Sequence, residues 1–325
     1  MNTAAELGER KIIEIILERL EPMPLMPIPF GDDVSAIDIG QGKLMVIKTD
    51  MLVGKTDVPP GMNLWQAARK AVIMNISDLA AKGVEPIAVL ASVGVPRGYV
   101  KKDVEQVGKG LNDGAREYDA YVLGGDTNEA SDLIISCSAF GVGTKRRLML
   151  RSGAKPGDYV AVTGLFGNTA AGLKILLRGL SAEPQMRKQF VDAVLMPHAR
   201  VREGAALAQT RAVTASIDSS DGLAWSLHEI SRASNVGFLI EKLPVDVKVE
   251  EFAKMHHLDP VELSLHGGEE YELVVTVKPK LWKTAEKAAP LIKIGFVTKE
   301  RSLLLKAGKK TIPIEARGWE HFKSS

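Results

Sequence analysis

Cysteine is nearly absent from this 325-residue chain, whose single example is Cys137. One cysteine can form no internal disulfide and no cysteine-based zinc cluster. Cys137 lies in the strand-like run LIISCSAF, where we expect a buried, unreactive thiol rather than a nucleophile. Long apolar runs are missing too: none approaches the ~18 residues that span a bilayer. The N-terminus also lacks the basic-then-apolar order of a secretory signal. We therefore expect a cytoplasmic protein that is not inserted in a membrane.

An excess of charge of one sign is also missing. The 42 lysines and arginines nearly balance 40 aspartates and glutamates, for a formal net charge of +2. Basic residues are scattered along the chain except for short runs such as KRR at 145–147. Without a polycationic segment, nucleic acid is a poor candidate partner.

Several common signatures of nucleotide and metal enzymes are absent. The sequence has no GxxxxGK[ST] loop, no HRD-type kinase loop, no GxGxxG, no HExxH and no CxxC pair. The phosphate-loop and protein-kinase ways of holding ATP are therefore excluded, and a dinucleotide enzyme is disfavoured.

The length and the alternation of elements predict two domains of the α/β or α+β class. The apolar pattern predicts helices near 9–20, 64–82 and 102–118, with strands at 43–47, 87–95 and 120–123. A segment rich in turn-forming residues, RSGAKPGDYV, then opens a second series of strands and helices. We place the boundary there, giving an N-terminal domain of residues 1–149 and a C-terminal domain of residues 150–325.

The helix expected over 64–82 carries a carboxylate on its apolar face. At roughly 100° per residue, Asn75 and Asp78 fall among its alanines, valine, isoleucine and leucines, whereas Arg69, Lys70 and Ser77 fall on the opposite face. A carboxylate that faces a core needs a paired partner or a metal ion. From this residue alone, a metal ligand and a half-buried cap of a neighbouring element are equally good interpretations of Asp78.

Aspartates recur where strands or helices are expected to end, beside glycine or a small hydroxyl residue. Each alone is better explained as a turn or cap residue. Together they suggest more than one magnesium ion, because carboxylate oxygens are the ligands that hard cations prefer. The set is Asp32, Asp33, Asp50, Asp78, Asp126, Asp218 and Asp221.

Two glycine-rich segments are candidates for phosphate binding. In Gly124-Gly125-Asp126 the missing side chains would let backbone amides approach a phosphate. GLFGNTAAG at 164–172 matches a strand–glycine–helix turn that can receive an anion, but a tight packing turn explains it equally well.

Taken in order, GDDVSAID, KTDMLV, MNISDLAAKG, GGDT, LRSGAKPGD, IDSSDGLA and GGEEYEL resemble the thiamine-monophosphate kinases. These enzymes belong to an ATP-binding superfamily that includes aminoimidazole ribonucleotide synthetase and selenophosphate synthetase. The resemblance extends from about residue 31 to GWEHF at 318–322. It implies an aminoimidazole-ribonucleotide-synthetase-like fold, with an N-terminal α/β domain that forms a dimer sheet or barrel and a C-terminal α/β domain. ATP and several magnesium ions would bind between them.

The resemblance also assigns roles to individual residues. It implies metal ligands at Asp32, Thr49, Asp50, Asp78, Asp126, Asp218 and Asp221, to which Asp33 of the same GDD motif is added. It implies nucleotide contacts at Gly125, Arg151 and Ser220, and substrate contacts at Glu269 and Trp319. To these we add Asp126 as a nucleotide contact and Asp57 as a substrate contact. The expected catalytic residues are Asp126, Arg151 and Asp221.

The substrate end departs from the family pattern at two places. Bacterial members follow DMLV with a histidine-containing segment, whereas this chain reads VGKTDV with Asp57 near that place. GGEEYEL replaces the commoner GGEDYEL. The implied reaction transfers the ATP γ-phosphoryl group to thiamine monophosphate and gives thiamine diphosphate. Its acceptor oxygen is already anionic, so it needs charge neutralisation more than a strong base.

Two other functions remain open from the sequence. One is a different enzyme of the superfamily, such as an ATP-dependent ligase similar to aminoimidazole ribonucleotide synthetase; the selenophosphate and hydrogenase-maturation relatives would carry a cysteine that this chain lacks. The other is a nucleotide-binding sensor without catalysis, which retention of all the aspartates disfavours.

Overall fold

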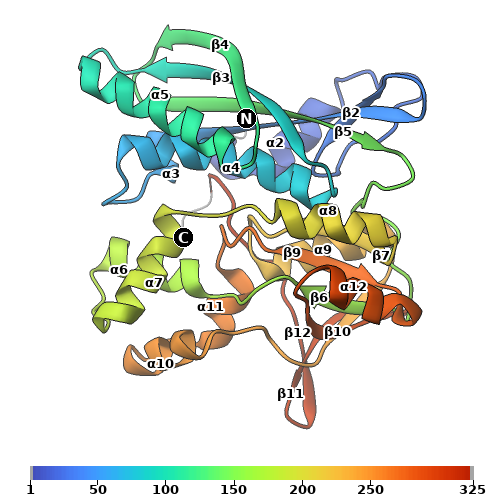
Figure 1. Cartoon of the computed structure of the whole chain (residues 1–325). Helices are drawn as coiled ribbons and strands as arrows, with labels where there is room; N and C mark the ends of the chain where they lie inside the picture. The colour runs from blue at the N-terminus through green and yellow to red at the C-terminus, as the bar shows by residue number, and fades with distance from the viewer. Residues whose placement is uncertain (1–2, 323–325) are drawn as a thin grey trace.

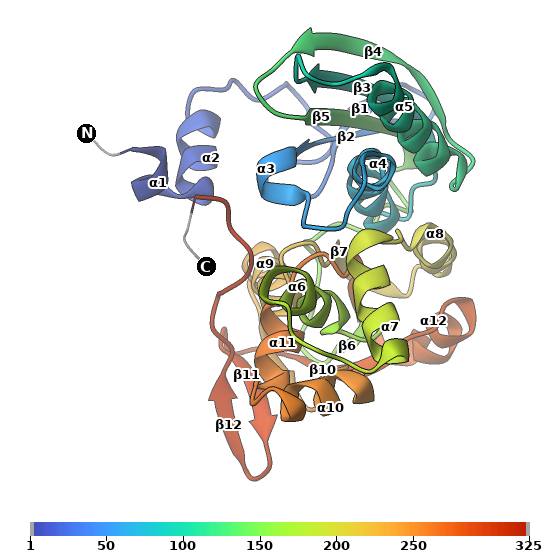
Figure 2. The same ribbon diagram turned by 90° about the vertical axis from the view of Figure 1, so that its left-hand side faces the viewer.

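The computed structural model describes residues 3–322, which form two β-sheets with helices packed against both (Figures 1 and 2). The first sheet has the order β1-β2-β5-β3-β4. Its strands are β1 (Ser35–Asp38), β2 (Lys43–Val53), β3 (Pro86–Val95), β4 (Tyr121–Glu129) and β5 (Ile134–Thr144). The pairs are antiparallel except β3 with β4.

The second sheet has the order β12-β11-β8-β10-β6-β9-β7. Its strands are β6 (Tyr159–Val162), β7 (Val213–Asp218), β8 (Gly237–Ile240), β9 (Leu273–Val277), β10 (Ile292–Thr298), β11 (Leu303–Ala307) and β12 (Lys310–Pro313). Only β11 with β8 is parallel among these pairs. Two mixed sheets, one from each half of the chain, confirm the expected α/β (α+β) class and two-domain fold.

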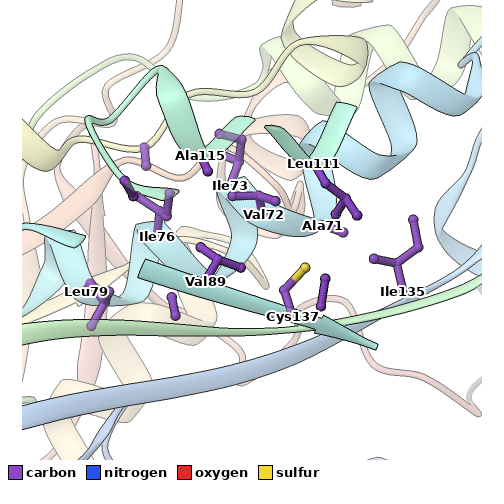
Figure 3. Packing of buried hydrophobic residues seen from close by; sticks show 14 of the residues in the cluster. Ala71, Val72, Ile73, Ile76, Leu79, Val89, Leu111, Ala115, Ile135 and Cys137 are labelled. Atoms are coloured by element: carbon purple, nitrogen blue, oxygen red, sulfur yellow. The ribbon is translucent and has the colours of Figure 1, made fainter. Parts of the chain in front are cut away.

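Two long helices cover one face of the first sheet: α4 (Leu64–Ala81) and α5 (Lys101–Arg116). Asn63 caps α4 through the Gln66 amide, in a capping box. Every second residue of β5 points toward α4, as expected of a half-buried strand. Figure 3 shows this core, with Cys137 between the sheet and the helices. The expected burial of Cys137 is confirmed, and burial raises the pKa of its thiol to about 12.

The opposite face of the first sheet is exposed although it carries apolar side chains. Met51, Ile87, Tyr121 and Leu123 are each more than half exposed. Almost every residue of β4, at the sheet edge, is exposed as well. Large apolar side chains exposed on one face of a sheet are a common feature of interaction sites.

The second sheet has helices on both faces. Neighbouring residues of β6 alternate between two apolar clusters, one with α9 (Leu223–Ser234) and one with α8 (Val201–Thr210) and α12 (Trp282–Ala288). A further cluster joins α6 (Asn168–Arg178), α7 (Pro184–Leu195), α10 (Val247–Met255) and α11 (Pro260–His266). Short helices complete the chain: α1 (Ala4–Leu7), α2 (Glu9–Leu17), α3 (Gly54–Asp57) and the 3₁₀ turn η1 (Pro279–Leu281). Within residues 3–322, no helix combines the length and apolar content needed to cross a bilayer.

Helix α4 lies between the two halves and is buried on both sides. Arg69, Lys70 and Ser77, which the sequence places opposite the apolar face, are all at most 1% exposed. The C-terminal half covers that face through α8 and β7. Local periodicity reports the first buried face of a helix but not the second, because the second depends on how the domains dock.

Two strands are longer than the sequence predicts. β2 continues past residue 47 through Asp50 to Val53, because it pairs with β5 along its whole length. β4 runs through Gly124-Gly125-Asp126 to Glu129 beside β3. The expectation that Asp50 and Asp126 follow the end of a strand was therefore wrong, since both lie within strands.

The two ends of the described chain lie together beside α9 (Figure 2). The backbone amide of His321 donates to Glu9 Oε2 at 3.1 Å, and Arg10 forms an ion pair with Glu320. The Arg10 guanidinium also lies 3.0 Å from the ring centroid of Trp225 on α9. These contacts fix the C-terminal segment that carries Trp319.

Candidate metal and nucleotide site

Three carboxylates from distant parts of the chain meet between its two halves. Asp33 follows the proline-rich connector, Asp78 lies on α4 and Asp218 ends β7. Each offers an oxygen within 4.8 Å of the other two, and all three residues are buried. The sequence predicted all three as metal ligands, and the structure brings them together.

The electrostatics of this cluster favour a bound cation. Burial first, and then repulsion by neighbouring aspartates, raise the pKa of Asp78 well above its ordinary value despite the attraction of Lys48. Burial and Asp33 raise the pKa of Asp218 to about 6. The neighbouring basic residues do not fully neutralise these carboxylates, so a bound divalent cation would stabilise their ionised forms. Carboxylate oxygens are suitable ligands for magnesium. The donor set therefore fits magnesium.

Lys48 connects Asp50 to this cluster. Its Nζ lies 3.1 Å from Asp78 Oδ2 and 3.2 Å from Asp50 Oδ1. Lys48 and Asp50 are two residues apart on β2 and share the face of the sheet that packs on α4. Burial disfavours the Lys48 ammonium, but the two aspartates outweigh it and raise its pKa.

A second lysine holds the GDD motif. Lys82 Nζ lies 2.7 Å from Asp32 Oδ1 and 2.5 Å from Asp33 Oδ2, and it donates to the Ser216 carbonyl at 2.9 Å. Arg151 reaches the same motif: its Nε donates to Asp33 Oδ1 at 2.7 Å, and its amide donates to Asp32 Oδ2 at 3.0 Å. Burial alone would raise the pKa of Asp33, but Lys82 and Arg151 keep it below its ordinary value.

Arg151 also pairs with Glu229 of α9, at 3.0 Å between Nη1 and Oε2. Its charge is thus shared between two internal carboxylates. The predicted contact of Arg151 with a nucleotide stays a prediction.

Asp221 lies at the edge of the site, at the start of α9. Burial first, and then the nearby Glu9, raise the pKa of the Asp221 carboxyl to about 7. Its carbonyl accepts a 3.1 Å hydrogen bond from the Trp319 amide. Asp221 therefore connects the acidic cluster to the C-terminal segment.

Three predicted residues lie on the exposed side of the first sheet or at its edge. Thr49 alternates with Asp50, so it points away from α4, where it donates to the Cys137 carbonyl at 3.0 Å. Asp126 pairs in register with Ser92 on the same outer face, and it is exposed. A Cβ on Gly125 would overlap the Ala91 carbonyl, so strand packing alone requires glycine there. Within one chain, the metal roles of Thr49 and Asp126 stay predictions.

The predicted substrate residues Asp57 and Glu269 lie close together because one lysine contacts both. Lys70 of α4 lies 2.5 Å from Glu269 Oε1 and donates to the Asp57 carbonyl at 3.0 Å. The Asp57 carboxylate accepts from the Val53 amide at 2.7 Å. His321 Nε2 lies 4.0 Å from Asp57 Oδ1. Trp319, two residues before it, is 46% exposed, and an exposed indole ring can receive a planar ligand.

The motifs DSSDG and GGEEYEL pack side by side. The Glu269 amide donates to the Ser220 carbonyl at 2.6 Å, and the Tyr271 amide donates to the Ser219 carbonyl at 2.9 Å. Glu269 and Tyr271 both have positive φ, which non-glycine residues rarely adopt and which is commoner at binding sites. This pairing places Ser220, predicted to contact the nucleotide, next to Glu269, predicted to contact the substrate.

The N-terminus of α6, a candidate anion site from GLFGNTAAG, is occupied by the chain itself. Glu270 Oε1 accepts from the amides of Gly167 at 2.7 Å and Thr169 at 3.2 Å. The packing interpretation of this turn is therefore the one that the structure supports.

Three lysines at this site were missed by the sequence analysis: Lys48, Lys70 and Lys82. Lys48 gave a usable signal, since a lysine two residues before Asp50 shares its face in any strand. Lys70 and Lys82 gave none, because their partners lie far along the chain.

The chain matches two family models. Residues 31–143 match AIR synthase related protein, N-terminal domain, and residues 155–306 match AIR synthase related protein, C-terminal domain. The thiamine-monophosphate kinase of Nitrosopumilus maritimus is 36% identical over 98% of this chain and 100% of its own. That of Pyrococcus abyssi is 39% identical over 97% of this chain and 96% of its own.

Solved structures give the same result. The structure "AaThiL complexed with AMPPCP and TMP" superposes with a TM-score of 0.86 at 26% identity and covers 99% of both chains. The thiamine monophosphate kinase from Aquifex aeolicus gives a TM-score of 0.80 at 26% identity, covering 91% of this chain and 96% of that one.

Proposed function

The chain belongs to the thiamine-monophosphate kinases among the AIR synthase related proteins, and from this premise we propose that it transfers the ATP γ-phosphoryl group to thiamine monophosphate. The single observation that carries the proposal is the meeting of Asp33, Asp78 and Asp218 from both halves of the chain. A relative with the same fold was solved with AMPPCP and TMP.

The carboxylates of this site would hold several magnesium ions, which supply positive charge to the nucleotide phosphates and the transferred group. Asp33, Asp78 and Asp218 form the centre, with Asp32, Asp50 and Asp221 around it. The acceptor is a phosphate oxygen that is already anionic, so this chain needs to place two anions rather than remove a proton. Arg151, held by Asp33, would add a fixed positive charge near the nucleotide.

Thiamine monophosphate would bind at the end of the site formed by Asp57, Glu269 and Trp319. The exposed Trp319 ring offers a stacking surface for a heteroaromatic ring. Glu269 offers a negative charge to the cationic thiamine part, and Lys70 fixes its orientation. The phosphate of thiamine monophosphate would then point toward Asp221 and the metal ions.

A second copy of the chain would cover the exposed face of the first sheet. Met51, Ile87, Tyr121 and Leu123 give that face the apolar character of a permanent interface. Thr49, Gly125 and Asp126 belong to the same region, so a homodimer would change the surroundings of all three. We place the domain boundary between residues 149 and 150, and the protein in the cytoplasm.

The direct test incubates the purified chain with ATP, magnesium and thiamine monophosphate, and follows thiamine diphosphate by mass spectrometry. Thiamine, and the substrate of aminoimidazole ribonucleotide synthetase, serve as competing acceptors in parallel reactions. The proposal predicts stoichiometric thiamine diphosphate and ADP. ATP binding without phosphorylation of any acceptor would favour the sensor, and turnover with the other superfamily substrate would favour the ligase.

A further inference from the structure

Lys48 holds the position that a cation would take between two of the predicted metal ligands. Its Nζ lies 3.1 Å from Asp78 Oδ2 and 3.2 Å from Asp50 Oδ1, nearly equidistant from the two carboxylates. The Lys48 side chain is only 20% exposed, so these two ion pairs are largely shielded from solvent. A divalent ion shared by Asp50 and Asp78 would have to displace this ammonium group.

The Lys48 ammonium changes the charge of the site. Six carboxylates meet here, from Asp32, Asp33, Asp50, Asp78, Asp218 and Glu229, and four cationic side chains pair with them: Lys48, Lys82, Arg151 and Arg232. The remainder is two negative charges, which a single divalent ion balances. Without Lys48 the remainder would be three, and close carboxylates that are not neutralised destabilise a fold.

Lys82 is not an equivalent cation. It is completely buried and also donates to the Ser216 carbonyl, so it binds the GDD motif to β7 as part of the core. Lys48 instead shares Asp78 with the Asp33–Asp78–Asp218 group. Of the two lysines, only Lys48 therefore competes with a metal ion for the Asp78 carboxylate.

We propose that Lys48 is a positioning residue that takes the place of one divalent ion between Asp50 and Asp78. In the absence of nucleotide, the site then binds its divalent ion at Asp33, Asp78 and Asp218. This inference rests on the proposed function in assuming a magnesium-dependent site. It goes beyond that function by predicting how many ions the chain itself requires.

The test counts bound Mn²⁺ directly, by electron paramagnetic resonance of free Mn²⁺ during a titration without nucleotide. The parent chain is expected to hold one tight Mn²⁺. Lys48→Ser removes the ammonium and leaves space with an oxygen donor, so it is expected to hold two. Lys48→Arg keeps the charge as the matched control, and is expected to remain at one.

Thermal unfolding gives a second readout. In chelator, Lys48→Ser is expected to melt several degrees below the parent, because Asp50 and Asp78 lose their shared cation. Mn²⁺ should restore most of the lost melting temperature of Lys48→Ser. It should raise the melting temperature of Lys48→Arg by no more than it raises that of the parent. An equal Mn²⁺ count and an equal Mn²⁺ shift in parent and Lys48→Ser would overturn the proposal.

If Lys48→Ser fails to fold, the number of Mn²⁺ ions bound by the parent chain still tests the proposal. Two tight Mn²⁺ ions on the parent without nucleotide would by themselves contradict a lysine in place of one ion. None of these measurements requires turnover, so they separate the two proposals. A chain that passes them but makes no thiamine diphosphate would refute the proposed function alone.

Discussion

Ser77 of α4 donates a 2.6 Å hydrogen bond to Asp218 Oδ2 of β7, between residues that are 141 positions apart. Both residues are buried. Ser77 belongs to the half of the chain that forms the first sheet, and Asp218 belongs to the half that forms the second. The bond orients one carboxylate of the acidic cluster from the opposite domain. The acidic cluster is therefore complete only when the two domains are docked.

Ser77→Ala tests this dependence. Loss of the donor leaves a buried carboxylate with one partner fewer, at a cost of about 1–3 kcal/mol. We expect a lower melting temperature in chelator, weaker Mg²⁺ binding and about a tenfold lower kcat, since 1.4 kcal/mol corresponds to that factor. Thermal unfolding, calorimetric titration with Mg²⁺ and steady-state kinetics measure these three quantities. Ser181→Ala, at an exposed position, is the control and should change none of them.

Asp78→Asn removes a central ligand while preserving side-chain volume. The pKa of Asp78 is raised well above its ordinary value, so its charge is unfavourable in the metal-free fold. We expect an equal or higher melting temperature in chelator, together with turnover lower by about two to four orders of magnitude. Exposed Asp192→Asn on α7 provides the comparison. Activity of Asp78→Asn within a few-fold of the parent would count heavily against the metal assignment.

Stability should depend on pH through four carboxyls whose pKa the fold raises: that of Asp78, which lies well above its ordinary value, and three others. The pKa values of Asp218, Asp221 and Glu270 are raised to about 6, 7 and 7, chiefly by burial. The unfolded chain releases these protons near pH 4, so between there and neutrality it holds fewer protons than the folded chain. Stability in chelator should therefore fall as pH rises from about 4 to 7. Differential scanning calorimetry across that range measures the slope.

Magnesium and Glu270→Gln divide that slope into two parts. Under the proposed function Mg²⁺ binds the ionised aspartates, so it should flatten the part due to Asp78, Asp218 and Asp221. Glu270→Gln keeps an oxygen for the Gly167 and Thr169 amides and should remove its own part with or without Mg²⁺. A slope that Mg²⁺ leaves unchanged would show that these aspartates do not bind it.

Asp57 has two candidate roles that different substitutions separate. Its carboxylate accepts from the Val53 amide, which a neutral amide oxygen can also do. If Asp57 also faces thiamine monophosphate with its charge, Asp57→Asn and Asp57→Ala should both raise the KM for that substrate more than the KM for ATP. If it only holds the loop, Asp57→Asn should behave as the parent. Equal effects on both KM values would remove Asp57 from the substrate side.

The sequence predicted the central part of the site because its signals are local. A carboxylate at helical spacing among the alanines of α4 identified Asp78, and aspartates beside glycines and serines identified Asp33 and Asp218. The alternation of strands and helices likewise predicted the fold class. Each of these inferences uses residues within a few positions of one another.

The parts that the sequence analysis missed depend on contacts between distant segments. Lys82 reaches Ser216 across 134 positions, and α4 buries Lys70 only because the C-terminal domain covers its second face. Asp50 and Asp126 lie within strands because β5 and β3 supply hydrogen bonds that no local pattern encodes. The nucleotide contact of Gly125 stays a prediction, because the close approach of Ala91 by itself requires glycine there.

The most direct test is anomalous diffraction from crystals grown with Mn²⁺ and a non-hydrolysable ATP analogue. The account predicts a peak within coordination distance of Asp33, Asp78 and Asp218, with the analogue's phosphates bound to the same ions. Manganese or phosphate density elsewhere, with these three carboxylates left without a metal, would contradict it.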